Sequence, residues 1–392
     1  MAPKVYDIIV VGTGPAGNTL SLKAAQKGYK VLIIEKGKLP REKTCAGGIP
    51  IKALDLIGLD FDTIVERKIK GAYLSFRNES IVHYEMPDIG ITVIRSRFDH
   101  FMTQEAVRAG CELAEETEFR FYEQYGSNIK AVTSRGSYLG KVLVGADGVY
   151  SKVRKCMRPD KRVWLAHAIE ALVYPEENML DLLGDNCLFD LGGIPRGYGW
   201  IFPKKDHFNI GLFKNRNRPE NANMRSRLDL FIRRNRILRG HKSMTVKGYP
   251  IPIRPISPDL AKDNVLLVGD AAGFGESFYG EGIMYAVWSS ALAITAITDL
   301  FTHGRPLSLY NSLVRPIVNT LFFSRVMSGL FYRAPRFGYY HIALNRWVNV
   351  YFAQLINRKV SHIECFLKAI LFSPLWFFAP KQGEISNKQD FC

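Results

Sequence analysis

Three glycines near the start of the chain have the spacing of a nucleotide-binding turn. Gly12, Gly14 and Gly17 stand between a continuous apolar run, 5–11, and a segment of small residues that suits a helix. In such a turn the first glycine allows a tight bend, the second lets a pyrophosphate approach the backbone, and the third lets helix and strand pack closely. The N-terminus of the helix then attracts the phosphates. An ordinary glycine-rich turn is the alternative, but the flanking elements favour dinucleotide binding.

An acid, Glu35, ends the next apolar run, 18 residues beyond Gly17. Its carboxylate would accept hydrogen bonds from the hydroxyls of an adenosine ribose and would repel a 2′-phosphate. The pattern therefore favours FAD or NAD over NADP. Only one such glycine fingerprint occurs in the sequence, which indicates that the chain has no dedicated nicotinamide domain.

Two later segments distinguish FAD from NAD. Residues 145–148 (Gly-Ala-Asp-Gly) and 269–273 (Gly-Asp-Ala-Ala-Gly) each follow an apolar strand, and an NAD dehydrogenase needs neither. Together with 95–99 (Arg-Ser-Arg-Phe-Asp), they resemble the flavoprotein superfamily of p-hydroxybenzoate hydroxylase. The resemblance implies that Asp270 binds the ribityl chain of FAD and that Arg95 reaches the cofactor. For Asp147 the simpler alternative to cofactor binding is a structural role, in which its carboxylate caps a turn, since Asp is common at turns.

Aromatic residues alternate in a strand near the middle of the chain. Tyr198, Trp200 and Phe202 recur at period two, so their side chains line one face of that strand. Taken alone, they favour ordinary sheet packing over a substrate wall. Together with the segment 45–48 (Cys-Ala-Gly-Gly), however, the run resembles the geranylgeranyl reductase family, FAD enzymes that saturate isoprenoid double bonds in chlorophyll side chains, archaeal lipids or quinone tails. The resemblance extends over most of residues 5–310.

The family resemblance implies a set of site residues. Cys45 would be the acid that protonates the substrate; the alternative for a free Cys is a small buried hydrophobe. Tyr198, Trp200 and Phe202 would form the wall of an apolar tunnel that holds the alkene and excludes water. No metal ligand is expected. The residues expected to bind FAD are Gly12, Gly14, Pro15, Ala16, Gly17, Glu35, Lys36, Arg95, Asp147, Gly148, Asp270, Gly280, Gly282 and Ile283.

The activity implied by the resemblance is the reduction of carbon–carbon double bonds in a geranylgeranyl or other prenyl chain on a lipid, quinone or chlorophyll-type molecule. Reduced flavin would supply the hydride, and the electron donor would be NAD(P)H, ferredoxin or a reduced quinone. The segment 276–279 (Glu-Ser-Phe-Tyr) departs from the Asn-Pro-Phe-Thr of many relatives. The alternative is an FAD-dependent aromatic hydroxylase (a monooxygenase) of the same superfamily, which leaves Cys45 and the aromatic run unexplained.

These motifs require a mixed α/β fold to position them. The sequence predicts a Rossmann-type FAD-binding domain interleaved with an antiparallel-sheet substrate domain, followed by a helical C-terminal region. Turns are predicted at Arg77–Asn78 and Pro87–Asp88. The apolar segment 283–298 is expected as a buried helix, not as a membrane span. The predicted domain ranges are 1–70, 95–160 and 260–303 for FAD binding, 71–94 and 161–259 for the substrate sheet, and 304–392 for the C-terminal region.

The chain is strongly basic. Lys and Arg number 53 against 37 Asp and Glu, a formal net charge of +16 that suits an anionic partner. The segment 304–381 carries ten Lys or Arg and a single acid, Glu364, interleaved with aromatic residues. This mixture is typical of a segment lying on an anionic membrane surface; the alternative is a helical cap that buries its aromatics on the catalytic domain. No nucleic-acid-binding motif occurs, so nucleic acid is not an expected partner.

The cysteines and the start of the chain bear on the compartment. Six Cys show no CxxC pair and no zinc spacing, and no charged and apolar leader opens the sequence. These features predict reduced thiols and no signal peptide. With the basic segment, they predict a cytoplasmic enzyme associated peripherally with the inner face of the membrane.

Overall fold

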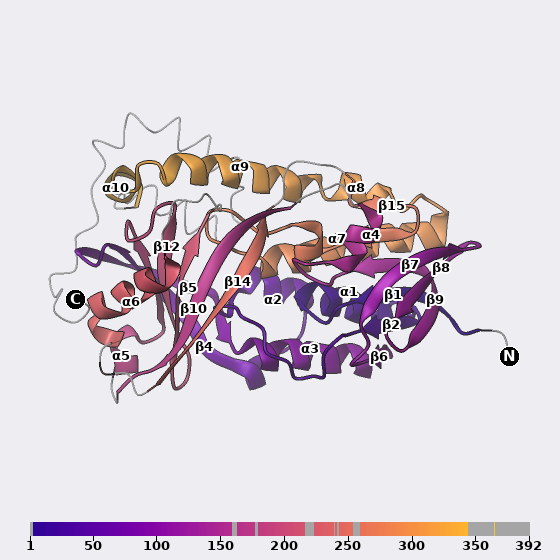
Figure 1. Ribbon diagram of the computed structural model, residues 1–392, viewed down its shortest axis with the longest axis horizontal. Helices are drawn as coiled ribbons and strands as arrows, with labels where there is room; N and C mark the ends of the chain where they lie inside the picture. Colours follow the sequence, from indigo (N-terminus) through magenta and orange to yellow (C-terminus); the bar gives the residue numbers. More distant parts are fainter. Residues whose placement is uncertain are drawn as a thin grey trace.

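Two β-sheets form the two halves of the molecule, and helices cover their faces (Figure 1). The computed structural model describes residues 3–158, 163–176, 179–215, 223–238, 240, 243–253, 259–343 and 364. Residues 344–363 and 365–381 of the basic C-terminal segment considered above therefore lie outside the described residues.

The first sheet, at the right of Figure 1, is built on parallel strands. Its strands are β1 (Val5–Val11), β2 (Val31–Ile34), β6 (Glu112–Ala114), β7 (Phe119–Tyr125), β8 (Asn128–Thr133), β9 (Gly136–Gly145), β15 (Ala261–Lys262) and β16 (Val265–Leu267). The order β15–β16–β9–β1–β2–β6 places β1 near the centre, paired in parallel with β2 and β9. β1 is apolar and mostly buried, as expected for a strand covered on both faces.

The second sheet, at the left of Figure 1, is antiparallel except where β4 pairs with β11, and its strands are listed here in chain order. They are β3 (Gly48–Pro50), β4 (Val65–Phe76), β5 (Ser80–Val93), β10 (Trp164–Tyr174), β11 (Asn186–Leu191), β12 (Gly197–Pro203), β13 (Phe208–Lys214) and β14 (Ser243–Ile253). The order is β14–β10–β13–β12–β11–β4–β5–β3, so β12 lies inside the sheet with neighbours on both sides.

Helices connect and cover the two sheets. They are α1 (Pro15–Gln26), α2 (Ile51–Ile57), α3 (Arg95–Arg108), α4 (Lys152–Met157), α5 (Met179–Leu183), α6 (Met224–Arg234), α7 (Ile283–His303), α8 (Leu309–Leu313), α9 (Arg315–Phe331) and α10 (Pro335–Phe337). Short 3₁₀ turns occur at Asp62–Ile64, Arg236–Leu238 and Gly269–Ala272, and a π-helical turn follows α10 at Gly338–Ala343.

α1 and α7 pack against each other in the core of the first half. The Ser290 hydroxyl of α7 donates a hydrogen bond to the carbonyl oxygen of Ala16 at 2.8 Å, so the two helices approach closely. Within the described part of the chain, α7 is the one helix long and apolar enough to cross a membrane, and 61% of its most apolar stretch is buried inside the protein. It is thus packed as the buried helix that the sequence predicts.

The described part of the C-terminal region is helical, as predicted. α9 runs along the top of the molecule in Figure 1, from the first half to the second. Beyond it, Tyr332 and Tyr339 are buried against the second half: the Tyr332 hydroxyl donates to the carbonyl oxygen of Phe278 at 2.7 Å, and the Tyr339 hydroxyl to that of Ser80 at 2.9 Å. These two aromatics are therefore buried as in the predicted helical cap, against the second half of the molecule.

The turn predicted at Arg77–Asn78 is confirmed, since both residues have positive φ between β4 and β5. The turn predicted at Pro87–Asp88 is wrong, because β5 continues to Val93. Its pairing with β4 passes from Glu85 to Gly90, and the residues between them bulge out of the ladder. A bulge accommodates a proline, which has no N–H to contribute to a ladder.

The boundary between the two halves also differs from the predicted ranges. β3 and the start of β4 lie within 1–70, the span assigned to FAD binding, yet both belong to the second sheet. β3 and β4 belong to the second sheet because β5 pairs with each of them. The chain therefore crosses to the second half directly after the segment that contains Cys45.

Candidate functional site

A cavity of about 1000 Å³ lies between the two halves of the molecule. Its walls come from the glycine turn, the ends of β1 and β2, the segment 41–50, several strands of the second sheet and the start of α7. Every predicted site residue except Gly17 lines it. The fold thus brings into one site residues that are spread from position 12 to position 283.

The glycine turn leaves room for a ligand at the N-terminus of α1. Gly12 has a φ of 105°, and a Cβ there would lie 2.5 Å from the carbonyl oxygen of Ala146. A Cβ on Gly17 would lie 1.9 Å from the carbonyl oxygen of Gly12, so this residue allows α1 to pack on the turn. A Cβ on Gly14 would meet no atom within 4 Å, because that position faces the cavity. The open space before the helix fits a pyrophosphate.

Glu35, at the end of β2, places a charged carboxylate on the cavity wall. Its oxygens accept hydrogen bonds from the N–H groups of Thr13 and Gly37, at 3.1 and 3.0 Å, and Nε of Arg41 lies 3.3 Å away. Burial acts to raise the pKa of Glu35, but the Arg41 charge and these hydrogen bonds outweigh it and lower the pKa. The carboxylate is therefore ionised, which its predicted role as acceptor for ribose hydroxyls requires.

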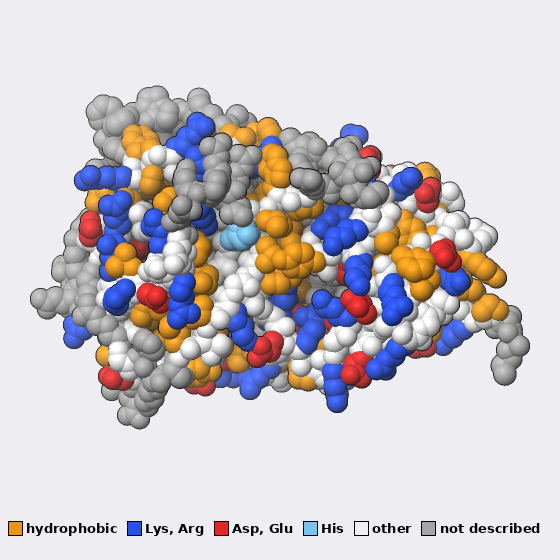
Figure 2. Space-filling model, viewed as in Figure 1, with side chains coloured by type: hydrophobic (Ala, Val, Ile, Leu, Met, Phe, Trp, Pro, Cys, Tyr) orange, Lys and Arg blue, Asp and Glu red, His pale blue; other side chains and the backbone are white. Residues whose placement is uncertain are grey.

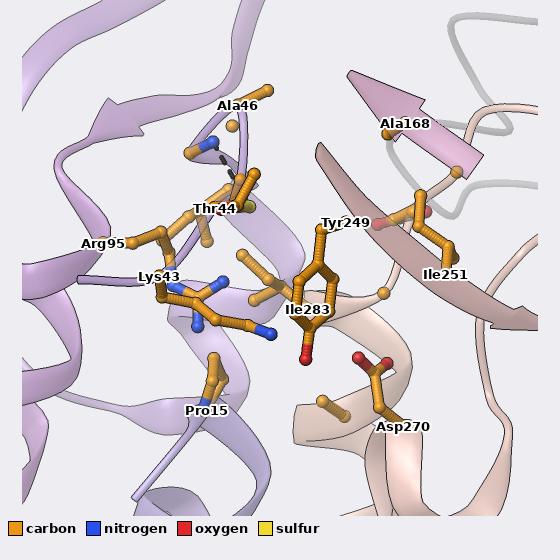
Figure 3. Close-up of a pocket in the computed structure, with 18 of the residues that line it drawn as sticks. Pro15, Lys43, Thr44, Ala46, Arg95, Ala168, Tyr249, Ile251, Asp270 and Ile283 are labelled. Carbon is orange, nitrogen blue, oxygen red and sulfur yellow. Dashed lines mark hydrogen bonds between the residues drawn. The ribbon is translucent and has the colours of Figure 1, made fainter. Parts of the chain in front are cut away.

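Charged side chains face one another across the middle of the cavity (Figure 3). Asp270 projects from one side, and Lys43 and Arg95 from the other; the Lys43 ammonium lies 3.3 Å from the centre of the Tyr249 ring. Burial lowers the pKa of Lys43 to about 8, opposed by the charge of Asp270. Burial raises the pKa of Asp270, opposed by Lys43 and Arg95. Opposite charges on two sides of an open space suit the polar ribityl chain and flavin edge of FAD.

The carboxylate of Asp147 caps the turn that follows β9, which is the structural role considered above as the alternative to cofactor binding. Its carboxylate accepts hydrogen bonds from the N–H groups of Lys152 and Val153, at 2.6 and 3.2 Å, and from the Ser151 hydroxyl. It therefore caps the start of α4. Asp147 and Gly148 also line the cavity, so the cap and a contact with the cofactor are compatible.

The loop that carries Cys45 is held by buried side chains of the second half. Glu170 of β10 accepts a hydrogen bond from the Cys45 N–H at 3.2 Å, and Lys204, directly after β12, donates to the carbonyl oxygen of Ala46 at 2.8 Å. Gly47 has a φ of 71°, and a Cβ there would lie 2.1 Å from a carbonyl oxygen of β5. These contacts explain why small residues follow Cys45, and they fix its position at the cavity wall.

The aromatic side chains of β12 form an apolar wall of the same cavity. Tyr198, Trp200 and Phe202 all line it. Phe189 of β11 packs against this row, with ring centroids 5.8 Å from Tyr198 and 5.5 Å from Phe202. The indole N–H of Trp200 donates to the amide oxygen of Asn209 at 2.9 Å, so its polar atom is satisfied away from the cavity. The wall suits a hydrocarbon chain.

Several residues of the site belong to no motif and were not predicted. Glu170 of β10, Tyr249 of β14 and Tyr332, directly after α9, line the cavity. Lys204 and Asn209 are not part of its lining, but they hold the Cys45 loop and Trp200 by hydrogen bonds. A weak signal existed for two of them, since Glu170 and Asn209 are polar residues inside largely apolar strands. A buried polar group of this kind usually has a hydrogen-bond partner, but the sequence does not show which one.

Glu276, in the segment that departs from the family pattern, is fully buried. Its carboxylate accepts hydrogen bonds from the N–H groups of Phe278 and Tyr279, both at 2.6 Å, and so shapes the loop that leads to Gly280 at the cavity. Burial raises the pKa of Glu276 to about 7, although these hydrogen bonds oppose the shift.

We expect Glu276 to make the stability of the protein depend on pH. A carboxyl whose pKa is higher in the folded than in the unfolded state contributes stability that is complete below the unfolded pKa and is lost as pH rises through the folded pKa. The free energy of unfolding should therefore fall between about pH 5 and pH 8. In Glu276→Gln, the decrease in the free energy of unfolding over this pH range should be smaller than in the wild type, by at most about 3 kcal/mol. Urea unfolding measures it, with Glu79→Gln at an exposed acid as the control; an unchanged slope in Glu276→Gln would contradict the expectation.

Comparison with known proteins defines the class of this protein. Residues 5–163 match the family model of the FAD binding domain. A halogenase solved in complex with FAD shares the fold, with a TM-score of 0.68, 15% identity and coverage of 82% of this chain and 75% of that chain. A geranylgeranyl bacteriochlorophyll reductase-like protein from Thermoplasma acidophilum has a TM-score of 0.75, 21% identity and coverage of 84% and 88%. These matches define a protein of the FAD-binding class, and they confirm the expected cofactor and the mixed α/β fold.

A sequence relative defines the family. Digeranylgeranylglycerophospholipid reductase 3 from Methanosphaera stadtmanae is 30% identical over 304 residues, which cover 74% of this chain and 76% of the relative. The chain belongs to the geranylgeranyl reductase family. The resemblance first seen in Cys45 and the aromatic run is thereby confirmed, whereas the roles of the individual residues stay predictions.

Proposed function

We propose that this protein is an FAD-dependent reductase that saturates carbon–carbon double bonds in the geranylgeranyl or other prenyl chain of a lipid, quinone or chlorophyll-type molecule. The observation that carries the proposal is a single cavity that joins the FAD-binding residues to the aromatic wall of β12, with Cys45 on its surface. Aromatic hydroxylation by the same cofactor gives no reason for a thiol at that place. The relatives named above support the same reaction.

The residues of the chain divide the work of this reaction. FAD held by the glycine turn, Glu35, Arg95 and Asp270 would supply the hydride, with an external reductant as the source of its two electrons. Tyr198, Trp200 and Phe202 hold the prenyl chain and exclude water from it. Cys45 donates a proton from Sγ to the alkene carbon that does not receive the hydride. Hydride and proton together add H₂ across the double bond, and the thiolate of Cys45 then regains a proton from solvent.

The proposal is tested with purified protein. Its absorption spectrum should contain the bands of oxidised flavin. Under anaerobic conditions with dithionite as reductant, it should saturate geranylgeranyl diphosphate, which mass spectrometry detects as a gain of hydrogen. Hydroxylation of an aromatic compound in air, without saturation of the prenyl chain, would favour the hydroxylase alternative. Separate reductions with NADH, NADPH, reduced ferredoxin and a reduced quinone, followed by flavin bleaching, would identify the donor.

We further propose that the enzyme works in the cytoplasm while attached to an anionic membrane surface. On α9 and α10, Phe322, Leu330 and Phe337 are 37%, 57% and 49% exposed, and Arg333 and Arg336 beside them are also exposed. Basic side chains outnumber acidic ones on the face of the molecule that Figure 2 shows. Exposed apolar and basic side chains together suit the headgroup layer of an anionic bilayer, where a prenylated lipid substrate lies.

Sedimentation with vesicles tests this attachment. The variant with Arg333 and Arg336 changed to Glu should bind vesicles rich in anionic lipid clearly less than the wild type, since each basic residue near such a surface contributes about 1 kcal/mol. The same charge change at Arg120 and Lys155, exposed residues of β7 and α4, is the matched control and should bind nearly as the wild type does. Equal binding of all three proteins, or binding by none, would refute the attachment. The helical cap would then be the remaining interpretation of the C-terminal region.

A further inference from the structure

A chain of buried hydrogen bonds connects Cys45 to Trp200. The Cys45 N–H donates to Oε1 of Glu170 at 3.2 Å. Nδ2 of Asn209 donates to Oε2 of Glu170 at 3.2 Å, and Nε1 of Trp200 donates to Oδ1 of Asn209 at 2.9 Å. Glu170 and Asn209 are only 7% and 2% exposed. Two side chains thus link the predicted proton donor to the predicted substrate wall.

The direction of these hydrogen bonds is determined by Trp200. Its indole N–H can only donate, so the amide oxygen of Asn209 must face Trp200 and the amide nitrogen must face Glu170. Both carboxylate oxygens of Glu170 therefore face N–H donors. An ionised carboxylate accepts well at both oxygens, whereas a glutamine in its place could accept at one.

Keeping this charge inside the protein is unfavourable. Burial raises the pKa of Glu170, opposed by the hydrogen bonds from Asn209 and the Cys45 N–H and by the charges of Lys204 and Lys247. An apolar residue of similar size would occupy a strand interior at a lower desolvation cost. The carboxylate is thus better explained by what it holds in place than by the stability of β10.

We propose that Glu170, together with Asn209, is a positioning residue that keeps the Cys45 thiol at a fixed place relative to the substrate wall at Trp200. The inference rests on the proposed function of Cys45 as the proton donor. Loss of one link frees the loop from the wall, and a displacement of about 1 Å at a reacting group lowers a rate by about 10²-fold. Neither residue donates the proton itself.

The direction of the hydrogen bond between Asn209 and Glu170 can be reversed by two substitutions that keep the shapes of both side chains. This reversal provides the test. In Glu170→Gln, the new amide nitrogen meets the amide nitrogen of Asn209, and one link is lost. In Asn209→Asp, two carboxylates face each other. In the double variant, the new amide donates to the new carboxylate, whose second oxygen accepts from Trp200, so the three links from Cys45 to Trp200 are satisfied again. The long hydrogen bond from Nδ2 of Asn209 to the carbonyl oxygen of Cys45, at 3.5 Å, is the one contact that the double variant does not restore.

We expect each single variant to lower kcat for saturation of geranylgeranyl diphosphate about 10- to 100-fold, with KM, FAD content and flavin reduction by dithionite near the wild-type values. The double variant should recover most of kcat. Alkylation of Cys45 by iodoacetamide, followed by peptide mass spectrometry, should be faster in Glu170→Gln and slow again in the double variant. The matched control is Asp190→Asn, which alters a buried acid of β11 bonded to Ser75 and Asn78 and should leave both readouts unchanged.

Two results would overturn the inference: a wild-type kcat in Glu170→Gln, or a double variant no faster and no better protected from alkylation than the single variants. Cys45→Ala separates this failure from that of the proposed function. If Cys45→Ala saturates the prenyl chain slowly while Glu170→Gln is fast, the positioning role of Glu170 is refuted and the role of Cys45 as proton donor stands. If Cys45→Ala is as fast as the wild type, the role of the thiol fails, and the inference fails with it.

Discussion

Gly14→Val should fold as the wild type does and should be purified largely without FAD. Gly14 has a φ of −75° and a ψ of 178°, a backbone conformation that any residue adopts. An added Cβ there would meet no protein atom within 4 Å. The fold therefore does not require glycine at this position, in contrast to Gly12 and Gly17. A branched side chain would instead fill the space before α1 in which the pyrophosphate is expected.

Titration of the apoprotein with FAD measures the effect. We expect the affinity to fall roughly 10- to 100-fold, the cost of forcing a side chain into an occupied site. The thermal midpoint of the variant without FAD should match that of the wild-type apoprotein. Gly329→Val is the matched control, because Gly329 lies on the exposed surface of α9 and an added Cβ there also meets no atom. Full flavin content in Gly14→Val would refute the assignment of the glycine turn; Glu35→Arg, which removes the ribose acceptor, should also lose FAD.

Cys45→Ala should bind FAD normally and saturate a prenyl chain about 10²- to 10⁴-fold more slowly, the range for loss of a positioned general acid. The thiol lies on the cavity wall in a loop fixed by Glu170 and Lys204. Its removal takes away the proton source and one long hydrogen bond, from the Gly47 N–H to Sγ at 3.4 Å, and leaves the contacts of Glu170 and Lys204 in place. Single-turnover reduction of geranylgeranyl diphosphate by the pre-reduced enzyme isolates this step from delivery of electrons.

Two further variants test the interpretation of Cys45. Cys45→Ser should recover little of the rate, because a hydroxyl is a much weaker acid than a thiol. Cys111→Ala removes a buried thiol that is bonded to the carbonyl oxygen of Ser21 and does not line the cavity, so its rate should be that of the wild type. If Cys45→Ala turned over at the wild-type rate, Cys45 would be a packing residue.

The sequence by itself determined the elements whose signals are local. The apolar run 5–11, the three glycines and Glu35 predict β1, α1 and β2, because strand, turn and helix are formed by neighbouring residues. The period-two spacing of Tyr198, Trp200 and Phe202 likewise predicts one common face of β12. Together with the segments 45–48, 95–99, 145–148 and 269–273, these patterns were sufficient for the cofactor, the fold class and the family.

The tertiary structure alone decided how the Cys45 loop is held. Glu170 and Cys45 are 125 residues apart, and Lys204 and Ala46 are 158 apart. Glu170 and Asn209 meet because β10 pairs with β13 in the register that places Leu172 opposite Asn209 and Glu170 opposite Gly211. That register depends on the burial of whole strand faces, and a shift of one residue in either strand would put the two side chains on opposite faces of the sheet. No local pattern specifies it, which is why the sequence predicted Cys45 without the residues that position it.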